Sequence, residues 1–253
     1  MKIKLSCIEC NNDPDLKKEY SFELRDDNTY SIKCDYGHES IIFYKSHKFE
    51  LLFEMGIYAM LDGYYREAVS NFATSIERFH EFSIEIFIQK LFNTKNTSPW
   101  LMQNKTSEYD KAWSKISNSS ERQLGAYTML YLSVYKFAPE LITTKQVEFR
   151  NKVIHKGYFP TEKETLDYAI VIFNYLQSKL LKLKENMNEE LEYVYERKMR
   201  EYIAKENVEG KHLVNWADIM TFRSLSPIDE VKSLVFNGIL EDRKYGYKSF
   251  VNK

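Results

Sequence analysis

The stretch Phe149-Arg150-Asn151-Lys152-Val153-Ile154-His155-Lys156-Gly157 has the pattern around which the rest of the chain is organised. At about 100° per residue, Val147, Phe149, Val153 and Ile154 form one apolar arc of a helix, and Gly157 is placed to end that helix. Arg150 falls inside the arc, although arginine is almost never fully buried without a partner. Two readings follow: a helix-end histidine beside an arginine whose stem reaches out to water, or two side chains placed for chemistry.

The composition is that of a globular protein rich in helices. The 253 residues are 43% hydrophobic and 29% charged, and the eight glycines and five prolines are too few for a turn-rich β fold. A net charge of −1 excludes a global field that attracts nucleic acid, so any such binding must rest on a local patch. Four lysines close to the opening stretch supply that patch: Lys145, Lys152, Lys156 and Lys163.

The N-terminal region predicts a structural zinc site. It carries the three cysteines of the chain, in the pattern Cys7-x2-Cys10 and Cys34-x3-His38. Three thiolates and one imidazole complete a tetrahedral zinc shell and leave no open position for a catalytic metal. The alternatives are free thiols with an incidental histidine, or His47 as the fourth ligand in place of His38.

Strand patterns surround these ligands. Residues 20–24 and 30–32 alternate in polarity and flank a turn at 26–28, so we expect a hairpin that brings the ligand pairs together. A further strand is expected at 41–43, which makes residues 1–44 a zinc ribbon. The first residues lack the apolar core of a signal peptide, and no apolar run reaches membrane-spanning length, so we expect a cytoplasmic protein without membrane contact.

Helical periodicity begins at Phe49. Residues 49–60 and 64–91 predict two helices joined by Asp62-Gly63, and the second has Ala68, Phe72, Ile76, Phe79, Ile86 and Leu91 facing inward. Glu77 and Arg78 border this apolar stripe. They are either a solvated surface pair, which is the favoured reading, or groups that orient the helix of the opening stretch.

The following segments complete the predicted bundle. A short helix is expected to dock through Trp100, Leu101, Trp113 and Ile116, and a helix from Glu121 presents Leu124, Met129 and Leu132. Thr143 or Thr144 caps the helix of the opening stretch. Thr161 and Glu164 form a capping box that starts a long helix, with Leu166, Ala169, Phe173, Leu176 and Leu180 in its core seam.

The C-terminal residues differ in character. A charged helix is predicted at 188–207 and another from Ser226-Pro227 to Phe236, followed by a hairpin over 239–250 that would suggest a winged helix. The predicted fold is therefore mainly α: a small zinc ribbon (1–44), an antiparallel helical bundle (45–185) and a C-terminal helical extension of unknown role (186–253).

The sequence Arg150-Asn151-x3-His155-x-Gly157, on the third of four bundle helices, resembles the R-x4-6-H motif of HEPN domains. The order of ribbon, helical hairpin, motif helix and long fourth helix is similar to that of bacterial HEPN proteins of toxin and antiviral-defence type. The resemblance covers about residues 45–185. It implies a metal-independent endoribonuclease whose homodimer places two motifs in one cleft, with an inhibitor or sensor protein as a further partner.

The resemblance assigns catalytic roles to Arg150, Asn151 and His155, and the residue types suit them. Histidine titrates near neutral pH, an arginine fork matches phosphate oxygens, and Asn151 can orient either group. Each chain offers one motif histidine, so acid and base roles would need both protomers. Two rival functions stay open: an inactive HEPN-like module that binds RNA or protein, and a DNA-binding regulator that uses the ribbon and the winged helix.

Overall fold

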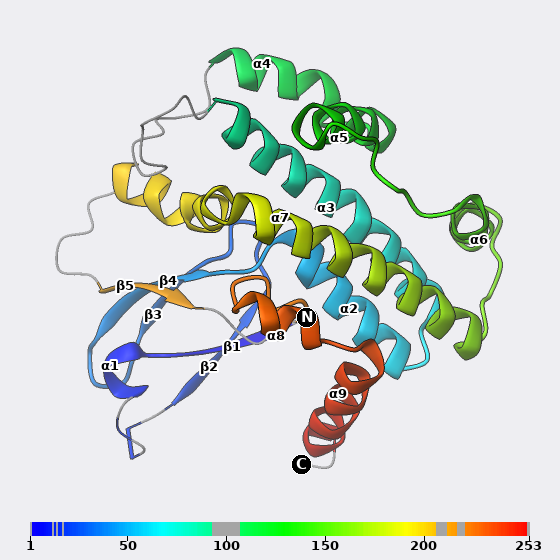
Figure 1. Cartoon of the computed structure of the whole chain (residues 1–253). Coiled ribbons are helices and arrows are strands. Elements are labelled where there is room, and N and C mark those ends of the chain that lie inside the picture. Colours follow the sequence, from blue (N-terminus) through cyan, green and yellow to red (C-terminus); the bar gives the residue numbers. More distant parts are fainter. Residues whose placement is uncertain are drawn as a thin grey trace. The chain divides into compact units, whose positions relative to one another are not determined.

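The computed structural model describes residues 2–11, 13, 15–16, 18–92, 107–205, 212–216 and 221–251. It divides the chain into two compact units (Figure 1). One combines residues 1–46 with 195–219, and the other combines 47–194 with 220–253. The chain is mainly helical with a small β region near its N-terminus, as predicted. The predicted third region, 186–253, is not separate, because its residues belong partly to each unit.

The β unit contains two antiparallel strand pairs. Strand β1 (Lys2–Ser6) pairs with β2 (Glu19–Glu23), and β3 (Thr29–Lys33) pairs with β4 (Glu39–Tyr44). The predicted hairpin between 20–24 and 30–32 is wrong, since β2 and β3 lie in different sheets. The physical reason is β1, whose Ile3 and Leu5 are buried and make it the better partner for β2.

A strand from the far end of the chain completes the second sheet. Strand β5 (His212–Trp216) runs parallel to β4, with Ile42 opposite Val214, so the sheet has the order β3-β4-β5. Parallel neighbours need a long crossover, and here the intervening chain includes the helical unit. Two more contacts within the β unit join residues 195–219 to the N-terminal strands. The ring of Tyr202 lies 5.4 Å from that of Phe43, and Lys45 pairs with Glu196 at 3.3 Å.

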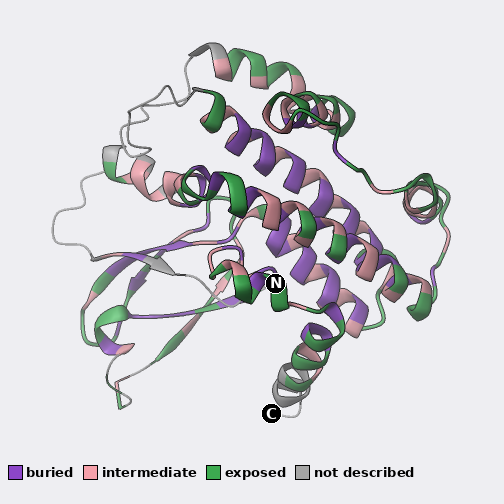
Figure 2. Cartoon of the chain, in the orientation of Figure 1, coloured by how far each residue is buried: buried purple, intermediate pink, exposed green. Residues whose placement is uncertain are grey.

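The helical unit is built on the hairpin of α2 (Lys48–Leu61) and α3 (Tyr65–Phe92), joined by Asp62 and Gly63 as predicted. Buried residues run along both helices in Figure 2. The helices approach closely because Gly56 has no side chain: a Cβ there would lie 2.5 Å from Cε1 of Phe72. The predicted inward residues of α3 are buried except Leu91, which is 48% exposed because it lies at the helix end.

Three shorter helices follow: α4 (Ser107–Ile116), α5 (Ser120–Tyr135) and α6 (Thr144–His155). Trp100 and Leu101 lie outside the described residues, and Trp113 and Ile116 are half-buried on α4. Of the apolar residues named for α5, Leu124 is half-buried, while Met129 and Leu132 are exposed. Gln123, Tyr127 and Tyr131 are buried instead, because α3 and α7 (Glu162–Lys205) offer them aromatic partners and polar groups.

Helix α7 starts with the predicted capping box. The amide of Thr161 donates to Glu164 Oε2 at 2.9 Å, and the amide of Glu164 donates to Thr161 Oγ1 at 3.2 Å. The core seam is buried from Ala169 to Leu180, while Leu166 is half-buried. The helix is interrupted at Met187, a non-helical residue (φ −148°, ψ 39°), and a second helical segment runs from there to Lys205, in agreement with the separate helix predicted at 188–207.

The C-terminal segment forms α8 (Ile228–Ser233) and α9 (Phe236–Val251). The predicted hairpin over 239–250 is therefore wrong, and no winged helix forms. A helix is favoured over a hairpin here because it buries Phe236, Ile239 and Leu240 on one face. It also lets Arg243 pair with the buried Glu54 of α2. The hydroxyls of Thr221 and Ser224 also donate to buried carboxylates of α2, Glu54 and Glu50, each at 2.6 Å.

Candidate functional site

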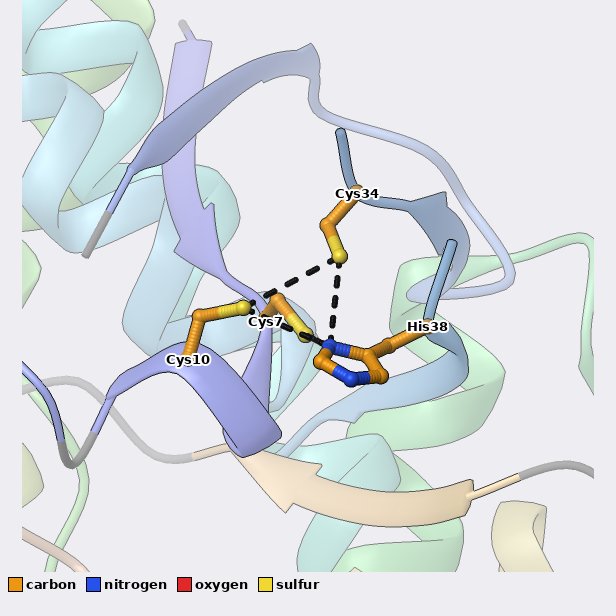
Figure 3. Close-up of side chains that lie close together, drawn as sticks. All are labelled: Cys7, Cys10, Cys34 and His38. Carbon is orange, nitrogen blue, oxygen red and sulfur yellow. Dashed lines mark hydrogen bonds between the residues drawn. The ribbon is translucent and has the colours of Figure 1, made fainter. Parts of the chain in front are cut away.

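The four predicted metal ligands come together at the ends of the two antiparallel strand pairs (Figure 3). Cys7 follows β1, and Cys10 lies on the short helix α1 (Ile8–Asn11). Cys34 and His38 form the turn between β3 and β4, where Gly37 adopts φ +85° and its amide donates to the carbonyl of Cys34 at 2.9 Å. Each ligand pair thus lies in the connection between two paired strands, β1 and β2 for the first pair and β3 and β4 for the second.

The distances fit one tetrahedral ion. All four ligand atoms lie within 4.8 Å of one another. His38 Nδ1 lies 3.4 Å from the sulfurs of Cys10 and Cys34 and 3.8 Å from that of Cys7, and Cys10 Sγ lies 3.9 Å from Cys34 Sγ. Tetrahedral zinc with usual bond lengths requires about 3.6 Å between nitrogen and sulfur and about 3.8 Å between sulfurs. The group is therefore compatible with a structural metal.

The protonation of the thiols also suits a cation. Burial, followed by the neighbouring Cys7 and Cys34, raises the pKa of Cys10 to about 12. Burial acts upward on Cys34 too, but backbone amides of Tyr36 and His38 bring the pKa of that thiol down to about 7. Three buried cysteines cannot all be thiolates side by side unless a cation joins them.

His47 does not take part in this group. It is the N-cap residue of α2, and its ring lies 4.4 Å from that of Phe82. The amide of His47 donates to Glu50 Oε2 at 2.9 Å, which fixes the start of the helix. The alternative ligand set with His47 is therefore wrong in this structure.

The second predicted site lies on α6, which ends at His155 and is followed by Gly157 at φ +68°. Arg150 is half-buried and points at α3, where Nη2 donates to Glu77 Oε1 at 2.7 Å. Nη1 donates to Asn151 Oδ1 at 2.9 Å. The reading favoured for Glu77 as a solvated surface group is therefore wrong. Arg78 instead contacts Glu81 at 2.6 Å and Gln123 at 3.2 Å.

The structure brings Arg150 and Asn151 together but does not add His155 to them. His155 lies five positions after Arg150, which corresponds to about 140° around a helix and about 7.5 Å along it. His155 is exposed at the last position of α6, while Arg150 faces α3. One chain therefore presents the two motif side chains on different faces.

The predicted lysines lie on α6, just after it and at the start of α7, and the charge of Lys152 contributes to the lowered pKa of Glu164. Lys145, Lys152, Lys156 and Lys163 are all exposed, and within the described ranges none forms an ion pair. Lys152 Nζ lies 3.4 Å from the centroid of the Tyr158 ring. By contrast, lysines of the β unit are neutralised by nearby carboxylates, in the pairs Lys4–Glu19, Lys18–Asp35 and Lys33–Glu39.

Sequence reasoning missed the residues that support this region. The hydroxyl of Tyr158 donates to Glu164 Oε1 at 2.9 Å, and this hydrogen bond raises the pKa of Tyr158. The amide of Thr161, and then Tyr158, lower the pKa of Glu164. On α7, the ring of Tyr168 packs 5.3 Å from that of Phe149. Of these contacts, the sequence pattern predicts only the capping box of Thr161 and Glu164.

Comparisons with protein-family models, curated protein sequences and solved structures found no match. Within the described residues, no helix has both the length and the apolar character needed to cross a membrane.

Proposed function

We propose that the protein is a metal-independent endoribonuclease of HEPN type, with the helical unit as a HEPN-like bundle and the β unit as a zinc ribbon. One observation carries the proposal: Arg150, oriented by Asn151 and Glu77, and the exposed His155 lie on the same helix, and four exposed lysines without ion pairs to described residues lie close to it in sequence. Exposed cations are the groups expected around a site for RNA phosphates.

The chemistry uses the RNA's own nucleophile. His155 of one protomer, as general base, takes the proton of a 2′-OH while that oxygen attacks the adjacent phosphorus. Arg150 binds the non-bridging oxygens as charge builds on the phosphorane. A second imidazole gives a proton to the departing 5′-oxygen. The products are a 2′,3′-cyclic phosphate and a 5′-hydroxyl, and no metal takes part.

A homodimer follows from this division of work. Because each chain offers one motif histidine, the general base and the general acid that flank one phosphate come from two protomers. Exposed apolar residues support an interface near the motif: of the 13 exposed large hydrophobic residues recorded for the described chain, six lie between 129 and 159. They are Met129, Leu132, Phe137, Leu141, Val147 and Phe159.

The ribbon is proposed to be structural, with Cys7, Cys10, Cys34 and His38 holding one zinc ion. Three of its exposed lysines, Lys4, Lys18 and Lys33, are paired with carboxylates, which reduces the positive charge available to nucleic acid there. The DNA-binding alternative also loses the hairpin of a winged helix, which is part of α9.

The second candidate is an inactive HEPN-like module that binds RNA without cutting it. Its supporting observation is the occupation of both terminal nitrogens of Arg150 by protein acceptors. A short incubation of purified protein with RNA in EDTA separates the two functions. The nuclease cleaves and leaves cyclic phosphate ends, whereas the module retains RNA in a complex and yields no fragments.

A further inference from the structure

A buried hydroxyl without a partner lies beside the motif. Tyr168 of α7 is 4% exposed, its ring packs on Phe149, and its hydroxyl makes no hydrogen bond within the described part of the chain. Leaving such a group unpaired destabilises the folded state. An unpaired buried donor calls for an explanation, and a partner in another state of the protein is one.

The partner that fits is Glu77. The Tyr168 ring packs 5.3 Å from that of Phe149, the residue before Arg150, and Arg150 pairs with Glu77 at 2.7 Å. In agreement with this placement, burial raises the pKa of Tyr168, the charge of Arg150 lowers it and that of Glu77 raises it. Arg150 engages only Oε1 of Glu77, and Oε2 has no hydrogen bond to any described residue. A carboxylate oxygen and a phenolic donor are thus both unused in this region.

We propose that Tyr168 is a positioning residue whose hydroxyl binds the Glu77 carboxylate when an RNA phosphate draws Arg150 away. The Glu77–Arg150 pair is then the resting state of the site. In the RNA-bound state the Tyr168 hydroxyl donates to the Glu77 carboxylate, which would otherwise be half-buried without its cation. This inference rests on the proposed function, because it requires Arg150 to bind phosphate.

Removal of the Tyr168 hydroxyl should affect RNA binding and not the stability of the fold. Tyr168→Phe keeps the ring against Phe149 and removes only the hydroxyl. In the resting state that hydroxyl has no partner, so the free energy of unfolding should stay unchanged or increase. RNA binding should weaken about fivefold, the worth of one hydrogen bond. Glu77→Gln should strengthen RNA binding, because no carboxylate then competes with phosphate for Arg150.

The test measures fluorescence anisotropy with a short 2′-O-methyl RNA, which cannot be cut because it lacks a free 2′-OH. Wild type, Tyr168→Phe, Glu77→Gln, the double variant and Arg150→Ala are compared, and urea unfolding is measured for each. The expected result is a loss for Tyr168→Phe that disappears in the Glu77→Gln background, where no charged group is stranded.

The outcomes identify which statement fails. If Arg150→Ala binds RNA like the wild type, Arg150 is not a phosphate ligand and the proposed function fails. If Arg150→Ala weakens binding but Tyr168→Phe does not, or weakens it equally in both backgrounds, the role of Tyr168 is overturned alone. A loss of stability in Tyr168→Phe without any change in RNA binding would also overturn it.

Discussion

Arg150 Nη2 lies 2.7 Å from Oε1 of Glu77, an ion pair that joins the motif helix α6 to α3. Each side chain is 27% exposed, so the pair is accessible to a ligand yet partly removed from water. The same contact that orients the guanidinium also gives it an acceptor with which RNA phosphate must compete. The ion pair with Glu77 explains why Arg150 can lie on the packed side of its helix.

The ribbon prediction concerns metal and stability. Purified protein should contain one zinc ion per chain by elemental analysis. Cys34→Ser should lose that ion and the ordered structure of the strands around it, because metal binding and folding of such a site are linked. Tyr36→Ser, a change at an exposed residue of the same turn, should retain the zinc. Wild-type protein without stoichiometric metal would contradict this assignment.

The interface prediction concerns Phe159, which is 81% exposed just after the motif helix. Light scattering should show an even-numbered assembly, most simply a two-fold dimer. Phe159→Ser should raise the dimer dissociation constant by about tenfold or more, since burial of a phenylalanine contributes roughly 1.5–3 kcal/mol. Tyr245→Ser is the matched control, because Tyr245 is 76% exposed on α9. A monomeric wild type that still cleaves RNA would rule out the shared cleft.

His80 gives a pH dependence with a defined sign. Burial, and then the charge of Lys179, lower the pKa of His80 from 6.5 to about 3. Between these values the unfolded chain binds a proton that the folded chain does not, so folding stability falls as pH decreases from about 6.5 towards 3. Above pH 6.5 this contribution is constant.

Urea unfolding at several pH values between 7.5 and 5 tests this dependence, with His80→Gln as the control. The glutamine amide can still hydrogen-bond the Tyr175 hydroxyl, which lies 2.9 Å from Nε2 of His80. Wild type should lose up to about 1.4 kcal/mol more per pH unit than His80→Gln below pH 6.5. Parallel pH profiles for the two proteins would show that His80 titrates normally in the fold.

Features that depend on residues close together in sequence could be predicted from the sequence. The spacing of Cys7, Cys10, Cys34 and His38 specified their cluster, because ligand geometry leaves few arrangements for such pairs. The α2–α3 hairpin and the capping box of Thr161 and Glu164 followed in the same way from periodicity and turn chemistry. Arg150 on the apolar arc likewise indicated a partner, although not which one.

Contacts between distant segments were not predictable. Nothing in residues 212–216 indicates that they pair with β4, because the choice of a parallel partner depends on the rest of the fold. The inner face of α5 consists of Tyr127 and Tyr131 rather than its aliphatic residues, since His80 and Phe87 of α3 lie opposite. The spacing around Glu77 indicates a surface group, because its partner Arg150 is 73 residues away in the sequence.

The central claim, RNA cleavage by the motif, is tested most directly at His155. It is exposed at the end of α6, so His155→Ala should leave helical content, zinc content and the free energy of unfolding close to those of the wild type. Loss of a positioned proton-transfer group should lower the cleavage rate by roughly 10²–10⁴-fold.

The measurement is the rate of RNA cleavage per folded molecule in EDTA, for wild type beside His155→Ala, with the fragment ends identified. We expect wild-type fragments that end in 2′,3′-cyclic phosphate and no detectable cleavage by the variant. Equal cleavage rates for the two folded proteins would contradict the nuclease assignment.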